Sequence, residues 1–360
     1  MPQTNTLDQT TRLAGVILGT AVGDALGLPR EGLSRRRARR LFGDPPLRHA
    51  FIGRRGMASD DTEHTCMTAQ ALLASHGEPH LFGRSLGWRL RGWILAFPAG
   101  VGLATARATI KLWLGFGPDC SGVWSAGNGP AMRAAIIGVY AREDITRLVQ
   151  LVKVSTRLTH TDPAAENGAL AVALAAGFGA GAGVDGINPD EYLCAVRPHL
   201  AGTPMMGLLE AVASRVSAGT LLGEYLQDAG LAGGISGYIN HTVPAAIFCW
   251  LKWPGDFREA VEQIIVAGGD TDTTGAIVGA LIGATAGPQA IPRDWLDSLF
   301  EWPRTVTWMK RLAEALADDI GPEPRKGRPL RLFWPGLLVR NIFFLLVVFM
   351  HGLRRALPPY

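Results

Sequence analysis

The sequence has 360 residues, enough to bury a substantial hydrophobic core, and this length allows two domains without requiring them. Hydrophobic residues make up 48% and charged residues 18%, a balance that excludes an intrinsically disordered chain. The formal net charge of +4 is small for this size. It suits acidic ligands such as phosphates but does not favour a dedicated nucleic-acid-binding protein.

Apolar residues at helical spacing recur from the N-terminus through most of the chain. Alternating strand patterns with hairpin turns are largely missing, and the linkers are short and rich in Gly and Pro. The predicted helices are Leu13–Leu26, Thr65–Ala74, Ala131–Val139, Ile145–Val154, Ala164–Ala176, Met205–Ser217, Ala245–Leu251, Phe257–Val266, Thr274–Ala284 and Trp308–Ala317. We therefore predict an all-α fold, with one compact domain over residues 1–320.

Two charged features stand out in the first forty residues. Asp24 interrupts the first apolar run, which makes residues 13–28 a poor signal peptide. Because glycines flank Asp24, we interpret it as a structural residue that holds nearby loops by hydrogen bonds, in preference to a catalytic role. Five arginines then fall within Ser34–Arg40. A solvated helix face is the favoured interpretation of this run, and attraction of a pyrophosphate or a nucleic acid is the alternative.

Two clusters of acidic and hydroxyl residues each stand at the start of a predicted helix. One is Ser59-Asp60-Asp61-Thr62-Glu63, and the other is Gly268-Gly269-Asp270-Thr271-Asp272-Thr273. Either cluster alone would be read as a helix cap, because Asp, Ser and Thr are the preferred capping residues. Capping needs only one side chain, however, and carboxylates with hydroxyls are hard oxygen ligands that suit Mg²⁺ or Mn²⁺. If the two clusters meet in space, they can bridge two metal ions.

Five short motifs occur in a fixed order over residues 13–310. They are Gly19-Thr20-Ala21-Val22-Gly23-Asp24-Ala25-Leu26-Gly27 with Glu31, Ser59-Asp60-Asp61-Thr62, Gly127-Asn128-Gly129 with Met132-Arg133, Thr159-His160-Thr161-Asp162-Pro163, and Gly268-Gly269-Asp270-Thr271-Asp272-Thr273-Thr274-Gly275. Taken together, they resemble the ADP-ribosylglycohydrolase family, whose bacterial type member removes ADP-ribose from dinitrogenase reductase. The resemblance implies a compact orthogonal bundle of helices, in agreement with the helical pattern.

The resemblance also implies a site with two Mg²⁺ or Mn²⁺ ions as cofactors. The implied metal ligands are Ser59, Asp60, Asp61, Asp270, Asp272 and Thr273. Glu31 and Asp61 become the candidate catalytic carboxylates that accept a proton from water, although Glu31 without the resemblance would be an ordinary loop residue. The implied substrate-binding residues are Gly127, Asn128, Gly129, His160 and Asp162. Some relatives carry a second histidine where this chain has Asp162, so a histidine pair is not expected here.

The end of the chain differs from the body. Residues 321–331 form a Pro-rich and basic linker, and residues 332–360 form an apolar C-terminal helix with a basic tail. A helix over Leu332–Met350 would be about 28 Å long, slightly short of a hydrocarbon core of about 30 Å. Arg340 inside it would cost on the order of 3 kcal/mol near the bilayer centre. A membrane span is therefore the least favoured outcome. Contact with a membrane surface through residues 332–355 and packing on the body or on a second subunit stay open.

The four cysteines, Cys66, Cys120, Cys194 and Cys249, form no CxxC pair and no zinc pattern. We expect buried free thiols, which suit a reducing compartment. The expected location is therefore the cytoplasm, with a peripheral position at the inner face of the membrane left open by the C-terminal segment.

The expected activity is the removal of ADP-ribose from a modified protein side chain, with arginine favoured, or from a small ADP-ribosyl compound. The alternative is a catalytically silent family member that binds ADP-ribose or resembles a crystallin, recruited to a membrane in one version. A nucleic-acid partner is not favoured, and the sequence does not indicate an oligomeric state.

Overall fold

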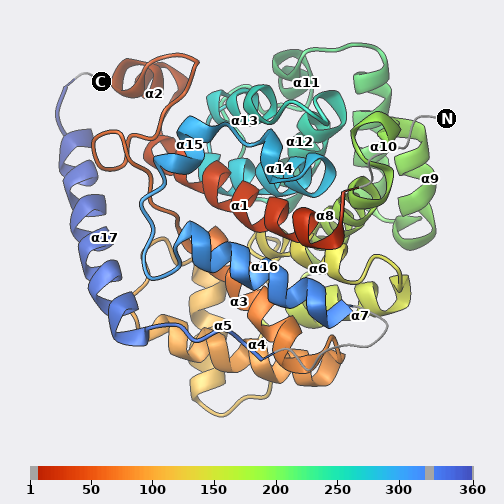
Figure 1. The fold of residues 1–360 in the computed structure, drawn as a ribbon. Helices are drawn as coiled ribbons and strands as arrows, with labels where there is room; N and C mark the ends of the chain where they lie inside the picture. Colours follow the sequence, from red (N-terminus) through yellow and green to blue (C-terminus); the bar gives the residue numbers. More distant parts are fainter. Residues whose placement is uncertain (1–6, 321–327, 359–360) are drawn as a thin grey trace.

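The computed structural model describes residues 7–320 and 328–358, and it confirms the all-α prediction (Figure 1). Extended pairing within these residues is limited to isolated bridges. The α-helices are α1 (Gln9–Gly27), α2 (Arg35–Phe42), α3 (Asp60–Ser75), α4 (Pro79–Ile94), α5 (Leu103–Trp113), α6 (Ala135–Tyr140), α7 (Ile145–Arg157), α8 (Pro163–Ala182), α9 (Pro189–Leu200), α10 (Pro204–Ser217), α11 (Leu222–Asp228), α12 (Ile239–Lys252), α13 (Phe257–Val266), α14 (Thr271–Ala286), α15 (Arg293–Asp297), α16 (Val306–Ile320) and α17 (Trp334–Arg355). Every helix predicted from the apolar pattern coincides with helical residues.

Helices α1 and α14 lie side by side at the centre of the fold, closer than most side chains allow. Gly19 of α1 faces Gly279 of α14, and a Cβ atom on either glycine would lie 2.1 Å from the carbonyl oxygen of the other. The same contact recurs one helical turn away on either side, at the pairs Gly15 with Gly283 and Gly23 with Gly275. This glycine seam fixes the C-terminal end of α1 beside the N-terminal end of α14.

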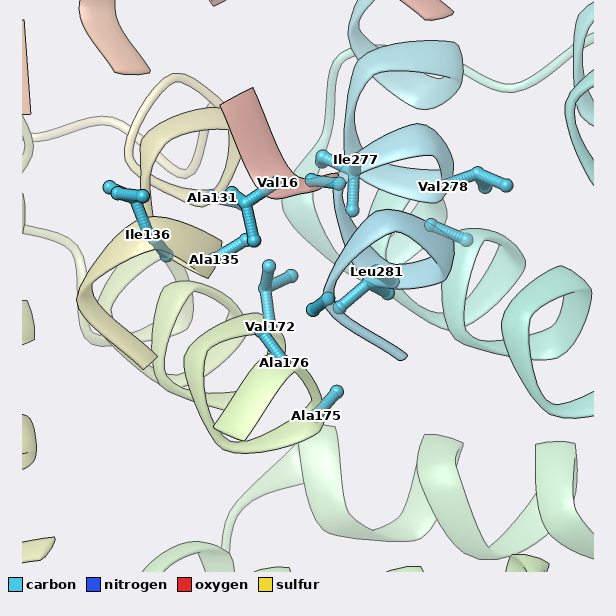
Figure 2. Packing of buried hydrophobic residues seen from close by; sticks show 14 of the residues in the cluster. Val16, Ala131, Ala135, Ile136, Val172, Ala175, Ala176, Ile277, Val278 and Leu281 are labelled. Carbon is cyan, nitrogen blue, oxygen red and sulfur yellow. The ribbon is translucent and has the colours of Figure 1, made fainter. Parts of the chain in front are cut away.

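Small and branched apolar residues fill the space around this helix pair. Figure 2 shows Val16 of α1 and Leu281 of α14 among residues of α6 and α8, such as Ala135 and Val172. All four of these side chains are buried. Burying a Val or Leu side chain contributes roughly 1.5–3 kcal/mol, so this core supplies the rigid base on which the ends of α1, α3 and α14 are held.

Asp24 connects the end of α1 to the start of α3. Its carboxylate accepts hydrogen bonds from the Ser59 backbone N–H at 2.9 and 2.8 Å, from the Thr62 backbone N–H at 3.2 Å and from the Thr62 hydroxyl at 2.6 Å. Burial raises the pKa of Asp24 to about 6, against the opposing effect of these bonds. The predicted structural role of Asp24 is confirmed, because this side chain caps the amide groups at the start of α3.

The C-terminal helix α17 packs along one edge of the body (Figure 1). Arg340 forms a buried ion pair with Glu301, at 2.9 and 2.7 Å, and also donates to the carbonyl oxygen of Ala58. The amide of Asn341 donates to the Ala96 carbonyl oxygen at 2.9 Å. The predicted helix therefore exists, with a polar attachment to the body. Of the linker predicted over residues 321–331, residues 321–327 lie outside the described residues.

Two of the described helices, α1 and α17, are long and apolar enough to cross a membrane by length and composition. They differ in their surroundings, since 94% of the apolar stretch of α1 is buried inside the fold and only 33% of that of α17 is. Helix α1 is thus a core helix, whereas α17 presents much of its apolar surface to solvent.

The cysteines are only partly as predicted. All four thiols are free, and Cys66 and Cys249 are buried. Cys120 and Cys194 are exposed, so the expectation of four buried thiols is wrong for these two. Cys120 lies in the loop after α5 and Cys194 on the outer side of α9, where the neighbouring apolar residues pack inward without it.

Candidate active site

A cavity of about 500 Å³ lies where the ends of α1, α3 and α14 meet. The chain after α1 contributes Glu31, the start of α3 contributes Ser59 and Asp60, and the start of α14 contributes Asp272 and Thr273. Other walls come from residues 99–102 and the start of α5, from the turn at residues 125–129 and from the inner side of α17. Three elements distant in sequence therefore place acidic side chains around one space.

The two acidic clusters make direct contact. The hydroxyl of Thr273 donates to Asp61 Oδ2 at 3.4 Å, and the hydroxyl of Ser59 donates to the same oxygen at 3.2 Å. Ser59 and Asp270 occupy the N-cap positions of α3 and α14, yet neither side chain makes a capping hydrogen bond. The capping interpretation therefore fails for both of these residues, and their side chains are left for the cavity.

Electrostatics in the cluster favour added positive charge. Burial, followed by repulsion from neighbouring carboxylates, raises the pKa values of Asp60, Asp61 and Asp272 well above the ordinary range. The pKa of Glu31 is also raised, by burial and then by Asp270, although Arg355 opposes this shift. The negative charges of these four carboxylates repel one another, and binding of a cation or of protons would offset this repulsion.

The carboxylate cluster fits a metal ion in its chemistry, although the described residues contain no group of three or more His, Cys, Asp and Glu side chains already arranged to hold one. Asp61 Oδ1 is buried without a hydrogen-bond partner among the described residues. A buried oxygen without a partner is costly, and a hard cation would satisfy it.

The glycine-rich turn is built against His160 and Asp270. Asn128 Nδ2 donates to Asp270 Oδ2 at 2.7 Å and to the Thr242 hydroxyl at 3.0 Å. A Cβ atom on Gly127 or Gly129 would lie 3.2 Å from the ring of His160, so both positions need a small residue. The cavity is lined by Gly127, Asn128, Gly129, His160 and Asp270, whereas Thr242 is not among its lining residues.

His160 lies at the cavity wall in its neutral form. Burial, assisted by the charge of Arg133, lowers its pKa to about 3. Its Nδ1 atom lies 2.9 Å from the Thr159 hydroxyl, which in turn accepts a hydrogen bond from Arg133 at 2.8 Å. His160 is thus held in one orientation and cannot supply a positive charge at neutral pH.

Two predicted residues lie elsewhere than expected. Asp61 is fully buried and does not line the cavity, whose acidic lining residues are Glu31, Asp60, Asp270 and Asp272. Asp162 caps α8 by accepting a hydrogen bond from the Ala164 backbone N–H at 2.9 Å, and it does not line the cavity. The sequence Asp162-Pro163 is a standard helix entry, and this local demand determines its position.

The wall formed by α17 was not anticipated from the sequence. Phe344, Val348, His351 and Arg355 line the cavity from this helix. His351 stacks on Phe51 with ring centroids 5.2 Å apart, and its Nε2 lies 2.9 Å from the Phe51 carbonyl oxygen. These residues are spaced by three or four positions, so they lie on one face of the helix. The sequence shows such a face but not the part of the protein that it packs against.

Comparison with known proteins decides the family. The model of the ADP-ribosylglycohydrolase family matches residues 5–325. The chain belongs to the ADP-ribosylglycohydrolase family. A solved structure titled "ADP-ribosylglycohydrolase-related protein complex" superimposes with a TM-score of 0.64 and 27% identity, covering 87% of this chain and 99% of that one. The predicted family and its fold are therefore confirmed, and α17 lies beyond the matched residues.

Curated relatives are similar along most of their length. An "Uncharacterized protein" of Archaeoglobus fulgidus is 32% identical over 291 residues, 79% of this chain and 90% of that protein. The "ADP-ribosylarginine hydrolase Tri1" of Serratia proteamaculans is 26% identical, over 88% of this chain and 81% of that protein. The "ADP-ribosyl-[dinitrogen reductase] glycohydrolase" of Rhodospirillum rubrum is 27% identical, over 80% of this chain and 90% of that protein.

Proposed function

We propose that this chain is a hydrolase that releases ADP-ribose from a modified protein side chain, with arginine favoured, or from a small ADP-ribosyl compound. One observation carries the proposal: carboxylates from three distant elements line a single cavity in a member of the ADP-ribosylglycohydrolase family. The name of the Serratia relative, an ADP-ribosylarginine hydrolase, supports arginine as the first acceptor to test.

We further propose that two Mg²⁺ or Mn²⁺ ions bind at the junction of the two clusters. Their ligands would be Ser59, Asp60, Asp61, Asp270, Asp272 and Thr273. The oxygen chemistry of this set, the partnerless Asp61 Oδ1 and the repulsion among the carboxylates support the assignment. When bound, such ions offset the negative charge and supply Lewis-acid activation of water and of ribose hydroxyls.

The reaction itself needs a proton acceptor beside the scissile bond. Cleavage of a ribosyl bond develops positive charge on the sugar ring, and the attacking water must lose a proton. Glu31 lines the cavity and is exposed, so we assign it this role. Asn128, held by Asp270 and Thr242, would orient the ribose through its remaining hydrogen-bonding capacity.

Arg355 makes one part of the cavity lining positively charged, in contrast to the carboxylates of the rest. Among the described residues that line the cavity it is the only lysine or arginine, and it comes from α17. Its guanidinium donates to the Pro29 carbonyl oxygen at 3.2 Å and leaves other N–H groups for a ligand. We therefore assign the diphosphate of ADP-ribose to the α17 side and the reacting ribose to the carboxylate side.

The test is release of free ADP-ribose from matched substrates that carry it on arginine, on serine or on a nucleic-acid end. We expect the arginine-linked substrate to be cleaved fastest with Mg²⁺ or Mn²⁺ and cleavage to stop in EDTA. Cleavage that persists in EDTA would refute the metal assignment while leaving the hydrolase assignment intact.

Binding measured in parallel separates catalysis from simple recognition. Calorimetry with ADP-ribose and Mg²⁺ should show binding, with turnover in the same buffer. Binding without cleavage of any of the three substrates would refute the hydrolase proposal and identify a silent ADP-ribose-binding protein.

A further inference from the structure

Helix α17 has two faces of different character. Its buried residues are Gly336, Leu337, Arg340, Asn341 and Phe344, which hold it to the body. On the opposite side a stripe of large apolar side chains is exposed to solvent. The outer stripe consists of Val339, Ile342, Phe343, Leu346, Phe349, Met350 and Leu353, with exposed fractions between 42% and 66%.

The outer stripe is continuous along the helix. Its members are spaced by three or four residues, so they form one row about 21 Å long from Val339 to Leu353. Soluble proteins rarely leave so large an apolar row uncovered unless it binds another surface. Phe333 and Trp334, at the beginning of the helix, extend the exposed apolar surface with aromatic rings.

Positive charge borders the outer stripe at both ends. Arg328 and Arg331 precede α17 and are exposed, and Arg354 is exposed in its last turn. The arginine-rich helix α2 lies against the same C-terminal end, where Arg37 donates to the carbonyl oxygen of Arg355 (Figure 1). Arg36 on α2 is exposed as well, whereas Arg39 forms an ion pair with Asp44 at 2.8 Å.

In the sequence no Asp or Glu occurs after Glu323, so α17 and the residues that follow it carry only positive charge. Two copies of the chain pairing through the outer stripe would place basic ends against basic ends in either orientation. An anionic lipid surface provides both an apolar layer for the stripe and negative headgroups for the arginines. Charge therefore favours a membrane over a second copy as the occupant.

The polar contacts between α17 and the body favour a helix that lies on the membrane surface over one that crosses the bilayer. Crossing the bilayer would pull Arg340 and Asn341 away from Glu301 and from the Ala96 carbonyl oxygen, and it would remove one wall of the cavity. Lying flat in the interface leaves both contacts and the cavity intact.

We propose that the outer stripe of α17, with the arginines at its two ends and on α2, is a docking surface for an anionic membrane. The helix lies flat in the interface while its inner face closes the cavity. This inference does not depend on the reaction that the cavity catalyses.

The test is flotation of the full chain with vesicles of phosphatidylcholine alone or mixed with phosphatidylglycerol. We expect binding to the mixed vesicles and little binding to the neutral ones. The double variant Leu346→Glu with Met350→Glu should bind at least about tenfold more weakly, because two exposed apolar side chains that would enter the lipid interface become charged. The matched control is Ile110→Glu with Leu114→Glu, an exposed apolar pair at the same spacing in the last turn and C-cap of α5, which should bind like the native chain.

The charge component is tested separately with Arg36→Gln on α2 and Arg331→Gln before α17. Each loss should weaken binding to mixed vesicles about fivefold at low salt, and added salt should weaken native binding. Circular dichroism and melting temperature check that every variant is folded, and hydrolysis of a soluble substrate should be unchanged in the stripe variants.

Three outcomes would overturn the proposal. Native chain that does not float, or stripe variants that float equally well, would show that the stripe does not bind lipid. A stable dimer in solution that the stripe variants separate would identify a second copy as the occupant. Protein that stays in vesicles through high salt and alkaline washing would indicate insertion across the bilayer in place of docking.

Discussion

Replacing Arg340 with glutamine tests how α17 is attached to the body. The guanidinium forms two hydrogen bonds to the Glu301 carboxylate and one to the Ala58 carbonyl oxygen, and both side chains of the pair are 4% exposed or less. Burial alone would lower the pKa of Arg340, but Glu301 and Glu63 outweigh it and raise that pKa. Arg340→Gln leaves Glu301 buried without its partner, which typically costs about 3–5 kcal/mol.

The second half of this experiment removes both charges. In Arg340→Gln with Glu301→Gln, no unpaired charge remains, and glutamine can still accept the hydrogen bond that Glu301 receives from the Ala58 backbone N–H at 3.0 Å. We expect the double variant to recover about 2–3 kcal/mol relative to the sum of the single variants. Glu63 keeps its own partner, because Arg304 lies 2.6 Å from it.

Urea unfolding of the native chain, both single variants and the double variant gives the free energies, with exposed Arg354→Gln as control. Loosening of α17 should also raise the KM for substrate, because the helix forms a wall of the cavity. A cost below about 1 kcal/mol for Arg340→Gln would place the pair among surface ion pairs and refute the attachment.

Four further substitutions probe the site and its support. Asp60→Asn should lower turnover at least about 100-fold and remove any rise of the melting temperature with Mg²⁺; retained activity would exclude Asp60 as a ligand. Arg355→Gln should weaken ADP-ribose binding in calorimetry about tenfold, whereas neighbouring Arg354→Gln should not; equal affinities would remove Arg355 from the diphosphate site. Gly279→Ala places a Cβ 2.1 Å from a carbonyl oxygen of α1, so urea unfolding should show a loss of about 1–3 kcal/mol, and an unchanged midpoint would contradict this packing. Burial keeps the pKa of His49 below its usual value, so the unfolded chain takes up a proton before the native chain as the pH falls below about 6.5. The free energy of unfolding should then decline by up to about 1.4 kcal/mol per pH unit, and it should decline less in His49→Gln. Parallel pH profiles of the two chains would contradict the assignment.

Much of the fold could be predicted from the sequence because helical spacing of apolar residues is a local property. The long helices α1, α8 and α14 follow this pattern closely. Helix α4 was missed, since only one narrow side of it, with Phe82 and Leu86, is buried and glycines and arginines dilute the apolar pattern.

The acidic site could be predicted from motif order but not from local pattern. Local sequence did not show that Asp24 would cap α3 and thereby leave the Ser59 side chain free, because Ser59 lies 35 residues from Asp24. The cap formed by Asp162 is local, since Asp before Pro is a usual helix entry, and the motif order placed this residue in the site instead. The position of α17 was beyond prediction for the same reason: the sequence shows Arg340 in an apolar helix, and only the fold brings Glu301 to it.

The glycine seam between α1 and α14 has a consequence for how this protein tolerates change. Because backbone touches backbone along three turns, no side-chain rotamer separates the end of α1 from the start of α14. Substitutions in the surrounding core can therefore change side-chain packing without changing the distance between the end of α1 and the start of α14. The position of the acidic residues after these helix ends should therefore tolerate substitutions in the hydrophobic core. It should not tolerate even one added methyl group at the glycines that recur every four residues along α1 and α14.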